Sequence, residues 1–210
     1  MKTKITYCIS LSLLLVACHS NPETAEQTTP TAAVKVLTAL EEPALDTFQD
    51  LPAGAVTETF EDTPGVVRVV VKNGANFSLL GSYKNKKREG NWVEYHPNGL
   101  VKSITPYVNG KIEGLYVELG NNGTLEKRCQ YHNGMRHGEY KEFNYATVKE
   151  ERTYVNDKLE GLVKVYYPNG KLMEEGSYKN GTRDGRSKWY DQNGNLSIEY
   201  EYKNGELVKK

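Results

Sequence analysis

Residues 107–131 read YVNGKIEGLYVELGNNGTLEKRCQY, and this stretch contains one complete copy of a unit that recurs along the chain. The unit opens with a tyrosine, continues with an Asn-Gly pair and places a glycine seven residues after the tyrosine. The tyrosines in this position follow one another at steps of 24, 24, 23, 24 and 24 residues, and they are Tyr83, Tyr107, Tyr131, Tyr154, Tyr178 and Tyr202. A period of this length indicates a tandem array, here of about five and a half units.

Two turn signals occur in each unit. One series of Asn-Gly pairs begins at Asn98, Asn122, Asn169 and Asn193, and the other begins at Asn109, Asn133, Asn180 and Asn204. Asn-Gly predicts a β-hairpin because both residues tolerate the positive φ of a type I′ turn. The sequence therefore predicts an all-β fold, an elongated single-layer antiparallel sheet made of tandem 24-residue hairpins.

The recurring glycine and the residue before it form two further series. Gly114 and Gly161 follow a turn, where we expect a positive φ or a close backbone approach. The preceding position is acidic in four units, at Glu89, Glu113, Glu160 and Asp184. A glycosidase pair needs carboxylates about 5–9.5 Å apart, whereas successive hairpins lie roughly 10 Å apart. We therefore interpret this series as charges that solvate the hairpin ends.

The array has two irregular regions. Residues 66–82 alternate like half a unit and are expected to cap the exposed first edge of the repeats at 83–210. In the third unit the sequence Asn144-Tyr145-Ala146-Thr147 replaces an Asn-Gly turn, and the period shortens by one residue. A kink is expected there, with a local recognition feature as the alternative.

The first 18 residues have the pattern of an export signal. Lys2 and Lys4 precede the apolar run at 5–16, which is too short to span about 30 Å of hydrocarbon as a helix. The run ends in Leu15-Val16-Ala17-Cys18, which resembles the lipobox of bacterial lipoproteins. That resemblance implies removal of the signal peptide at 1–17. It also implies that Cys18 carries diacylglycerol and acyl chains such as palmitate, which hold the protein in a membrane.

Residues 18–65 are expected to be a flexible tether after the lipidated cysteine. From His19 to Gly65 the chain is acidic and broken by prolines, a composition typical of disordered linkers. The basic residues beyond Gly65 are spread among acidic ones, so nucleic acid is not an expected partner. Once Cys8 is removed and Cys18 is lipidated, Cys129 is the remaining thiol and has no disulfide partner.

The units resemble the MORN repeat family in its bacterial variant form. The matching residues are the Tyr-x-Asn-Gly-x3-Gly units, and the stretch from Tyr131 to Tyr140, YHNGMRHGEY, is the nearest to the family core. The resemblance covers about Tyr83 to Lys210. It implies curved single-layer sheets that act in scaffolding and in protein or lipid contact. Bacterial variants often carry an antitoxin-like label, which transfers no mechanism.

We find no motif of a nucleophilic hydrolase, a phosphate loop, a dinucleotide site or a zinc protease. Cys129, His132 and His137 have part of a metal-ligand spacing, but a fourth ligand is lacking. The sequence therefore predicts a protein that is not an enzyme and needs no cofactor or metal.

Aromatic residues near the strand centres are the candidate binding residues, because tyrosine and tryptophan offer flat apolar rings with a polar group. They are Trp92, Tyr95, Tyr116, Tyr140 and Trp189. The expected partner is a protein. A glycan or peptidoglycan, or the target of an antitoxin- or immunity-type binder, is the alternative. His19 and Ser20 follow Cys18, which by resemblance to enteric lipoproteins favours the outer membrane, facing the periplasm or the cell surface.

Overall fold

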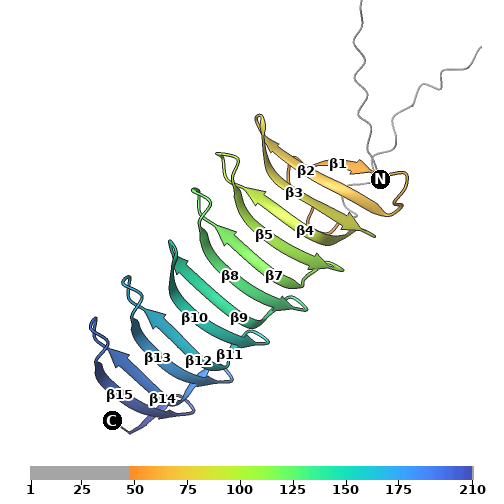
Figure 1. Cartoon of the computed structure of the whole chain (residues 1–210). Coiled ribbons are helices and arrows are strands. Elements are labelled where there is room, and N and C mark those ends of the chain that lie inside the picture. The colour runs from red at the N-terminus through yellow and green to blue at the C-terminus, as the bar shows by residue number, and fades with distance from the viewer. Residues whose placement is uncertain (1–47, 210) are drawn as a thin grey trace, which may run out of the picture. The chain divides into compact units, whose positions relative to one another are not determined.

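The computed structural model describes residues 48–209, so the signal peptide at 1–17, Cys18 and most of the expected tether lie outside the described part. Between residues 48 and 209 the regular structure is entirely β-strand. Sixteen strands form one open antiparallel sheet whose order follows the chain, with two strands of two residues each lying off this path (Figure 1). This confirms the predicted all-β array of hairpins.

The strands follow one another with short connections. Their bounds are β1 (Val56–Thr59), β2 (Val66–Asn73), β3 (Asn76–Lys84), β4 (Lys87–Tyr95), β5 (Val101–Val108), β6 (Lys111–Ile112), β7 (Gly114–Leu119), β8 (Leu125–His132), β9 (Met135–Asn144), β10 (Thr147–Val155), β11 (Lys158–Leu159), β12 (Gly161–Tyr166), β13 (Leu172–Lys179), β14 (Thr182–Tyr190), β15 (Leu196–Lys203) and β16 (Glu206–Lys209). The repeats are numbered here from their opening tyrosines, so the first begins at Tyr83 and the fifth at Tyr178.

The backbone conformation at the recurring positions explains why they are occupied by glycine. Gly114 has φ 106° and Gly161 has φ 80°, a region that favours glycine because it has no Cβ. A Cβ at Gly161 would meet nothing within 4 Å, so close packing is not the reason. Each of these two glycines begins a longer strand, β7 or β12, just after a two-residue strand, β6 or β11, has ended. The expected positive φ is confirmed.

The two series of Asn-Gly pairs form different turns. In the series of Asn109-Gly110 both residues have positive φ, 51° and 83°, as predicted. In the series of Asn98-Gly99 only the glycine does, with φ 85°, so the prediction of type I′ turns is wrong there. The Gly99 N–H donates to the His96 carbonyl at 2.9 Å, as in a three-residue loop that ends in a left-handed glycine.

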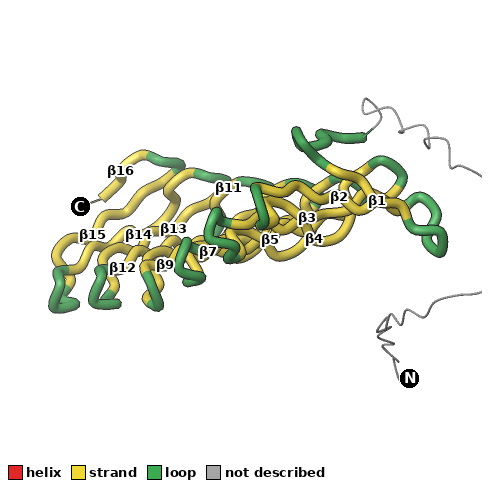
Figure 2. The backbone as a smooth tube through the Cα atoms, turned by 90° about the horizontal axis from the view of Figure 1, so that it is seen from above, coloured by secondary structure: helices red, strands yellow, loops and turns green. Residues whose placement is uncertain are grey.

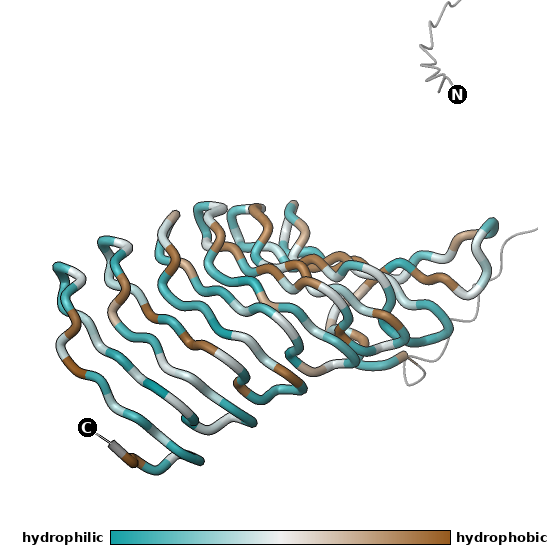
Figure 3. Tube along the Cα trace, turned by 60° about the horizontal axis from the view of Figure 1, so that its bottom comes forward, coloured by the Kyte–Doolittle hydropathy of each residue, from teal (hydrophilic) through white to brown (hydrophobic). Residues whose placement is uncertain are grey.

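Side-chain alternation divides the sheet into two faces. One, called the tyrosine face, carries Tyr83, Trp92, Tyr107, Tyr116, Tyr131, Tyr140, Tyr154, Tyr178, Trp189, Tyr200 and Tyr202, as the strand register requires. The opposite face carries charged residues such as Glu139, Lys141 and Glu151, which form ion pairs. Figure 2 shows the strands as one layer, and Figure 3 shows apolar stretches that recur from hairpin to hairpin between hydrophilic ones.

The main core lies at the amino-terminal end of the sheet. Val69, Tyr83 and Trp92 are buried there, and Phe48 and Leu51 pack against them. Strand β1 also pairs with β2, so the predicted boundary between tether and cap at residue 66 is wrong. The composition of residues 18–65 is that of a linker, yet its last part contains apolar side chains that cover the first rings of the tyrosine face.

Candidate functional site

The register separates the five predicted binding residues. Trp92, Tyr116, Tyr140 and Trp189 lie on the tyrosine face, whereas Tyr95 lies on the opposite face. Tyr95 directly follows Glu94, which shares the tyrosine face with Trp92, so alternation turns its ring to the other side. The structure therefore brings four of the five rings onto one face.

Trp92 is a core residue, and its assignment as an exposed binding residue is wrong. Its side chain is 2% exposed, and its indole N–H donates to the Ser82 carbonyl at 3.1 Å. The ring lies over Gly81, where even a Cβ would overlap it. Its neighbours Tyr83 and Tyr107 meet it edge-on, with ring centroids 5.2 and 6.0 Å away.

Arginines that have the same place in the first, third and fifth repeats stack on the rings of the tyrosine face. The guanidinium carbon of Arg88 lies 4.4 Å from the Trp92 ring centroid, and that of Arg136 lies 4.2 Å from the Tyr154 centroid. Arg183 lies 5.3, 5.4 and 5.6 Å from the rings of Tyr178, Trp189 and Tyr202. Such cation–π contacts hold the rings in place.

Sequence reasoning left these arginines out of the site. The signal that identifies them is their constant place five residues after an opening tyrosine, in Tyr83 to Arg88, Tyr131 to Arg136 and Tyr178 to Arg183.

Carboxylates complete the same face between the rings. The Tyr116 hydroxyl donates to Glu118 at 3.0 Å, and Lys127 donates to the same carboxylate at 2.9 Å, which lowers the pKa of Glu118. Burial, followed by the Glu118 carboxylate, raises the pKa of Tyr116. The phenol therefore stays protonated at neutral pH. This surface offers flat rings and polar groups that these bonds hold in place, which is suited to binding.

The first repeat already binds a segment of the same chain. The Tyr83 hydroxyl donates to the Gln49 carbonyl at 2.6 Å, and Arg88 donates to the Asp50 carbonyl at 3.1 Å. The Phe48 ring lies against Tyr83 with centroids 5.0 Å apart. Tyrosine, arginine and an adjacent ring thus hold two backbone carbonyls and an aromatic side chain.

The third repeat has the same set of residues as the first. Tyr131, Arg136 and Tyr140 correspond in position to Tyr83, Arg88 and Trp92. Here Arg136 donates to the Asp157 carboxylate at 2.8 Å, and Tyr131 and Tyr140 are partly exposed. Among residues 48–209 no segment packs over this copy as Phe48 and Leu51 pack over the first.

The acidic series joins consecutive repeats along one edge of the sheet. Each carboxylate accepts the backbone N–H of the asparagine that opens the next turn, 20 residues ahead: Glu89 from Asn109, Glu113 from Asn133, Glu160 from Asn180 and Asp184 from Asn204. The contact with Asn133 lowers the pKa of Glu113. These residues are structural, which explains their fixed place in the repeat.

Two residues of the suggested metal-ligand spacing, His132 and His137, lie side by side with ring centroids 5.8 Å apart. His132 contacts Glu113 at 2.8 Å, and Cys129 is buried. No group of three metal-binding side chains occurs within residues 48–209. In the same stretch no helix has the length and apolar character that crossing a membrane requires.

Comparison with known proteins supports the repeat assignment. No curated protein matches the chain. The family model described as MORN repeat variant matches residues 88–109, 159–180 and 183–204. These segments begin in the first, fourth and fifth repeats, so three repeats of this sheet are of the MORN variant type.

Proposed function

We propose that this protein is an envelope lipoprotein whose repeat sheet binds a protein partner through the tyrosine face. The observation that carries the proposal is the docking of the chain's own Phe48 and Leu51 on the first repeat. A surface that holds one peptide segment with tyrosine, arginine and an aromatic ring is suited to hold another where the same residues recur.

The composition of the face supports a protein partner. Tyrosine, tryptophan and arginine are enriched where protein interfaces gain most of their binding energy. Stacking by Arg136 and Arg183 fixes the rings before a partner binds. Few side chains therefore lose conformational freedom on binding, and the entropic cost of association is lower. Contacts at the third and fifth repeats would be weak singly and would add when one partner spans both.

The anchor is the second element of the proposal. Lipid on Cys18 would hold the sheet at a membrane, with the chain up to Phe48 as the connection. Replacing Cys18 with Ala is expected to abolish labelling by radioactive palmitate and to leave the precursor uncut. Normal cutting without label would contradict the lipoprotein assignment and leave the binding surface unaffected.

A peptide titration tests the binding surface. A labelled peptide with the sequence of residues 44–57, ALDTFQDLPAGAVT, is added to the full-length protein in detergent, and binding is followed by fluorescence anisotropy. We expect a dissociation constant of about 0.1–1 mM, weakened at least roughly threefold by Tyr131→Phe or Arg136→Ala.

Two controls accompany this titration. Lys164→Ala, on the opposite face, is expected to leave the affinity unchanged, and a peptide with serine in place of Phe48 is expected to bind less. The proposal is contradicted if no binding occurs up to roughly 5 mM, or if Lys164→Ala weakens binding as much as Arg136→Ala.

A further inference from the structure

The turns at the edge that carries Asn98 are bonded from one repeat to the next. Asn98 Nδ2 donates to the Asn121 carbonyl at 2.6 Å, and Asn169 Nδ2 donates to the Gln192 carbonyl at 3.4 Å. The Tyr167 hydroxyl donates to the Tyr190 carbonyl at 2.8 Å. Each turn is thus held by its neighbour.

The shortened third repeat interrupts this series. Asn144 pairs directly with Thr147, so Tyr145 and Ala146 form a two-residue turn. Asn122 does not bond across to it in the described part of the chain. Its Oδ1 accepts the N–H of Thr124 at 3.1 Å, as Asn98 Oδ1 accepts that of Leu100, but its Nδ2 has no partner among residues 48–209. A hollow of about 360 Å³ opens between the two turns, and its walls are formed by Asn121, Asn122, Thr124, Glu126, Lys127, Glu142, Phe143, Asn144 and Tyr145.

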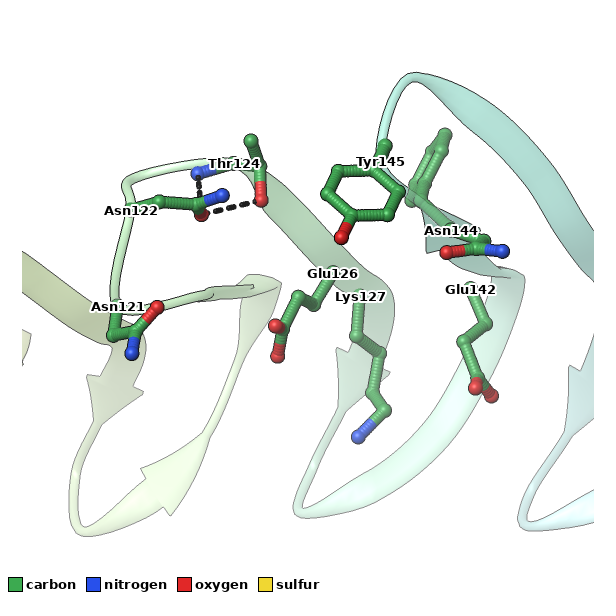
Figure 4. A pocket seen from close by; sticks show the side chains of 9 residues that line it. Asn121, Asn122, Thr124, Glu126, Lys127, Glu142, Asn144 and Tyr145 are labelled. Carbon is green, nitrogen blue, oxygen red and sulfur yellow. Dashed lines mark hydrogen bonds between the residues drawn. The ribbon is translucent and has the colours of Figure 1, made fainter.

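The hollow combines an aromatic ring with a free carboxylate. Figure 4 shows the Tyr145 ring above Glu126 and Lys127, with Asn121 and Asn122 on one side and Glu142 on the other. Lys127 is paired with Glu118 at 2.9 Å, and Glu142 is paired with Lys149. Glu126 has no ion-pair partner among residues 48–209, so its carboxylate remains available as an acceptor.

Tyr145 occupies the first position of the two-residue turn, where a hairpin of this length requires a positive φ and glycine or asparagine is the usual residue. Its φ is 54°, in the left-handed region, which is unfavourable for a bulky side chain. The regular turns of this edge have glycine with positive φ, such as Gly99 and Gly123. The ring is also 75% exposed and gains little from packing. Strain at an exposed residue of this kind marks functional sites.

We propose that the hollow binds one sugar unit of a glycan. The apolar C–H face of a pyranose packs on the Tyr145 ring, and its hydroxyl groups donate to Glu126 and accept from the side-chain amides of Asn121 and Asn122. The volume lies within the range of small-ligand sites, roughly 300–1,000 Å³. The positive charge of Lys127 beside Glu126 and Glu142 makes binding of a bare metal cation unfavourable, and the polar walls make binding of an apolar ligand unfavourable. Lys127 and Glu142 lie at the turn end of the tyrosine face, so the hollow adjoins the peptide surface, but Tyr145 and Glu126 are not part of that surface and extend the function beyond it.

Binding is measured on the full-length protein in detergent by saturation-transfer NMR and calorimetry. The probes are tetramers of N-acetylglucosamine, of its deacetylated form and of α-1,4-linked glucose. We expect at least one to bind with a dissociation constant below about 5 mM. Stronger binding of the deacetylated tetramer is the result expected if Glu126 pairs with an ammonium group. Failure of all three would overturn the proposal.

Two substitutions separate binding from folding. Tyr145→Gly removes the ring and relieves the backbone, so we expect at least about tenfold weaker binding with an equal or higher unfolding midpoint. Glu126→Gln is expected to weaken binding about fivefold or more. Gln192→Ala, in a regular turn of the same edge, is the matched control and leaves affinity unchanged. Retained affinity in Tyr145→Gly would overturn the proposal.

A repaired turn gives an independent test. Replacing residues 144–147 with HPNGL, the sequence of residues 96–100, restores the 24-residue period and the contact between turns. The variant keeps Glu126 and Lys127 and is expected to fold with the same circular dichroism spectrum but to lose sugar binding. Binding that persists in this variant would show that the hollow is not the site. Peptide binding by the tyrosine face is unaffected by either result.

Discussion

At the scale of single residues, the packing of Trp92 depends on the absence of a side chain at Gly81. A Cβ on Gly81 would lie 2.6 Å from Cε2 of Trp92, and the ring cannot move because Tyr83 and Tyr107 flank it. Gly81→Ala is therefore expected to lower the free energy of unfolding by about 1–3 kcal/mol, measured by urea denaturation.

A double-mutant cycle checks the cause of that loss. In a Trp92→Leu background the same glycine substitution should cost much less, since the smaller side chain leaves room for the Cβ. An equal cost in both backgrounds would mean that backbone conformation, and not the ring, requires Gly81.

The charged network of the opposite face makes stability depend on pH. Lys141 lowers the pKa of Glu151 from 4.5, so the ionised carboxylate stabilises the fold above that pH and loses this effect as pH falls through the lowered value. The Tyr166 hydroxyl donates to Glu151 at 2.9 Å, and burial with that carboxylate raises the pKa of Tyr166 to about 12.

We expect Glu151→Gln to be less stable than the native protein at pH 7 and equally stable near pH 2. Urea denaturation across this range gives the difference. A stability difference that stays constant down to pH 2 would mean that the carboxylate contributes through packing alone.

At the scale of elements, the repeat pattern predicted the strands and one series of turns correctly. The other series differs because Asn98 uses its side chain to accept from the Leu100 N–H at 3.1 Å, which a sequence motif of two letters does not distinguish. Conversely, Asn156 and Asp157 form a turn with positive φ at both residues, 48° and 66°, although glycine is missing. The period, not the local signal, is what indicates that turn.

The site was predicted less completely than the fold, for two physical reasons. The alternation of side chains along a strand shows which face a ring lies on, but not whether a segment distant in sequence covers it. Trp92 is covered because Phe48 and Leu51 pack on its cluster. Stacking of Arg88 on Tyr107 and of Arg183 on Tyr202 joins residues from different strands. The pairing register is needed to see it.

The glycine that opens β12 gives a test at this scale. Gly161→Val forces a branched side chain into φ 80°, and we expect a loss of about 1–3 kcal/mol in the free energy of unfolding. The neighbouring Leu162, 50% exposed, is the control, and Leu162→Val should cost less than about 1 kcal/mol. Similar losses at both positions would contradict a special backbone role for Gly161.

At the scale of the whole sheet, stability is concentrated at the end where Phe48 and Leu51 cover the first repeat. Phe48→Ser with Leu51→Ser should lower the free energy of unfolding by about 2–4 kcal/mol, since two apolar side chains lose their buried area. Tryptophan fluorescence should shift to longer wavelength as water reaches Trp92. Phe60→Ser, at a ring already 42% exposed, serves as the control and should change neither quantity appreciably.

Contact between the tyrosine face and a protein partner can be detected by photo-crosslinking in the producing cell. A photoreactive phenylalanine analogue replaces Tyr178 on the tyrosine face or Lys164 on the opposite face, and the protein is irradiated in the intact envelope. Binding through the tyrosine face predicts one defined crosslinked protein from position 178 and none from position 164. A crosslinked protein from position 164 alone, or none from either position, would contradict it.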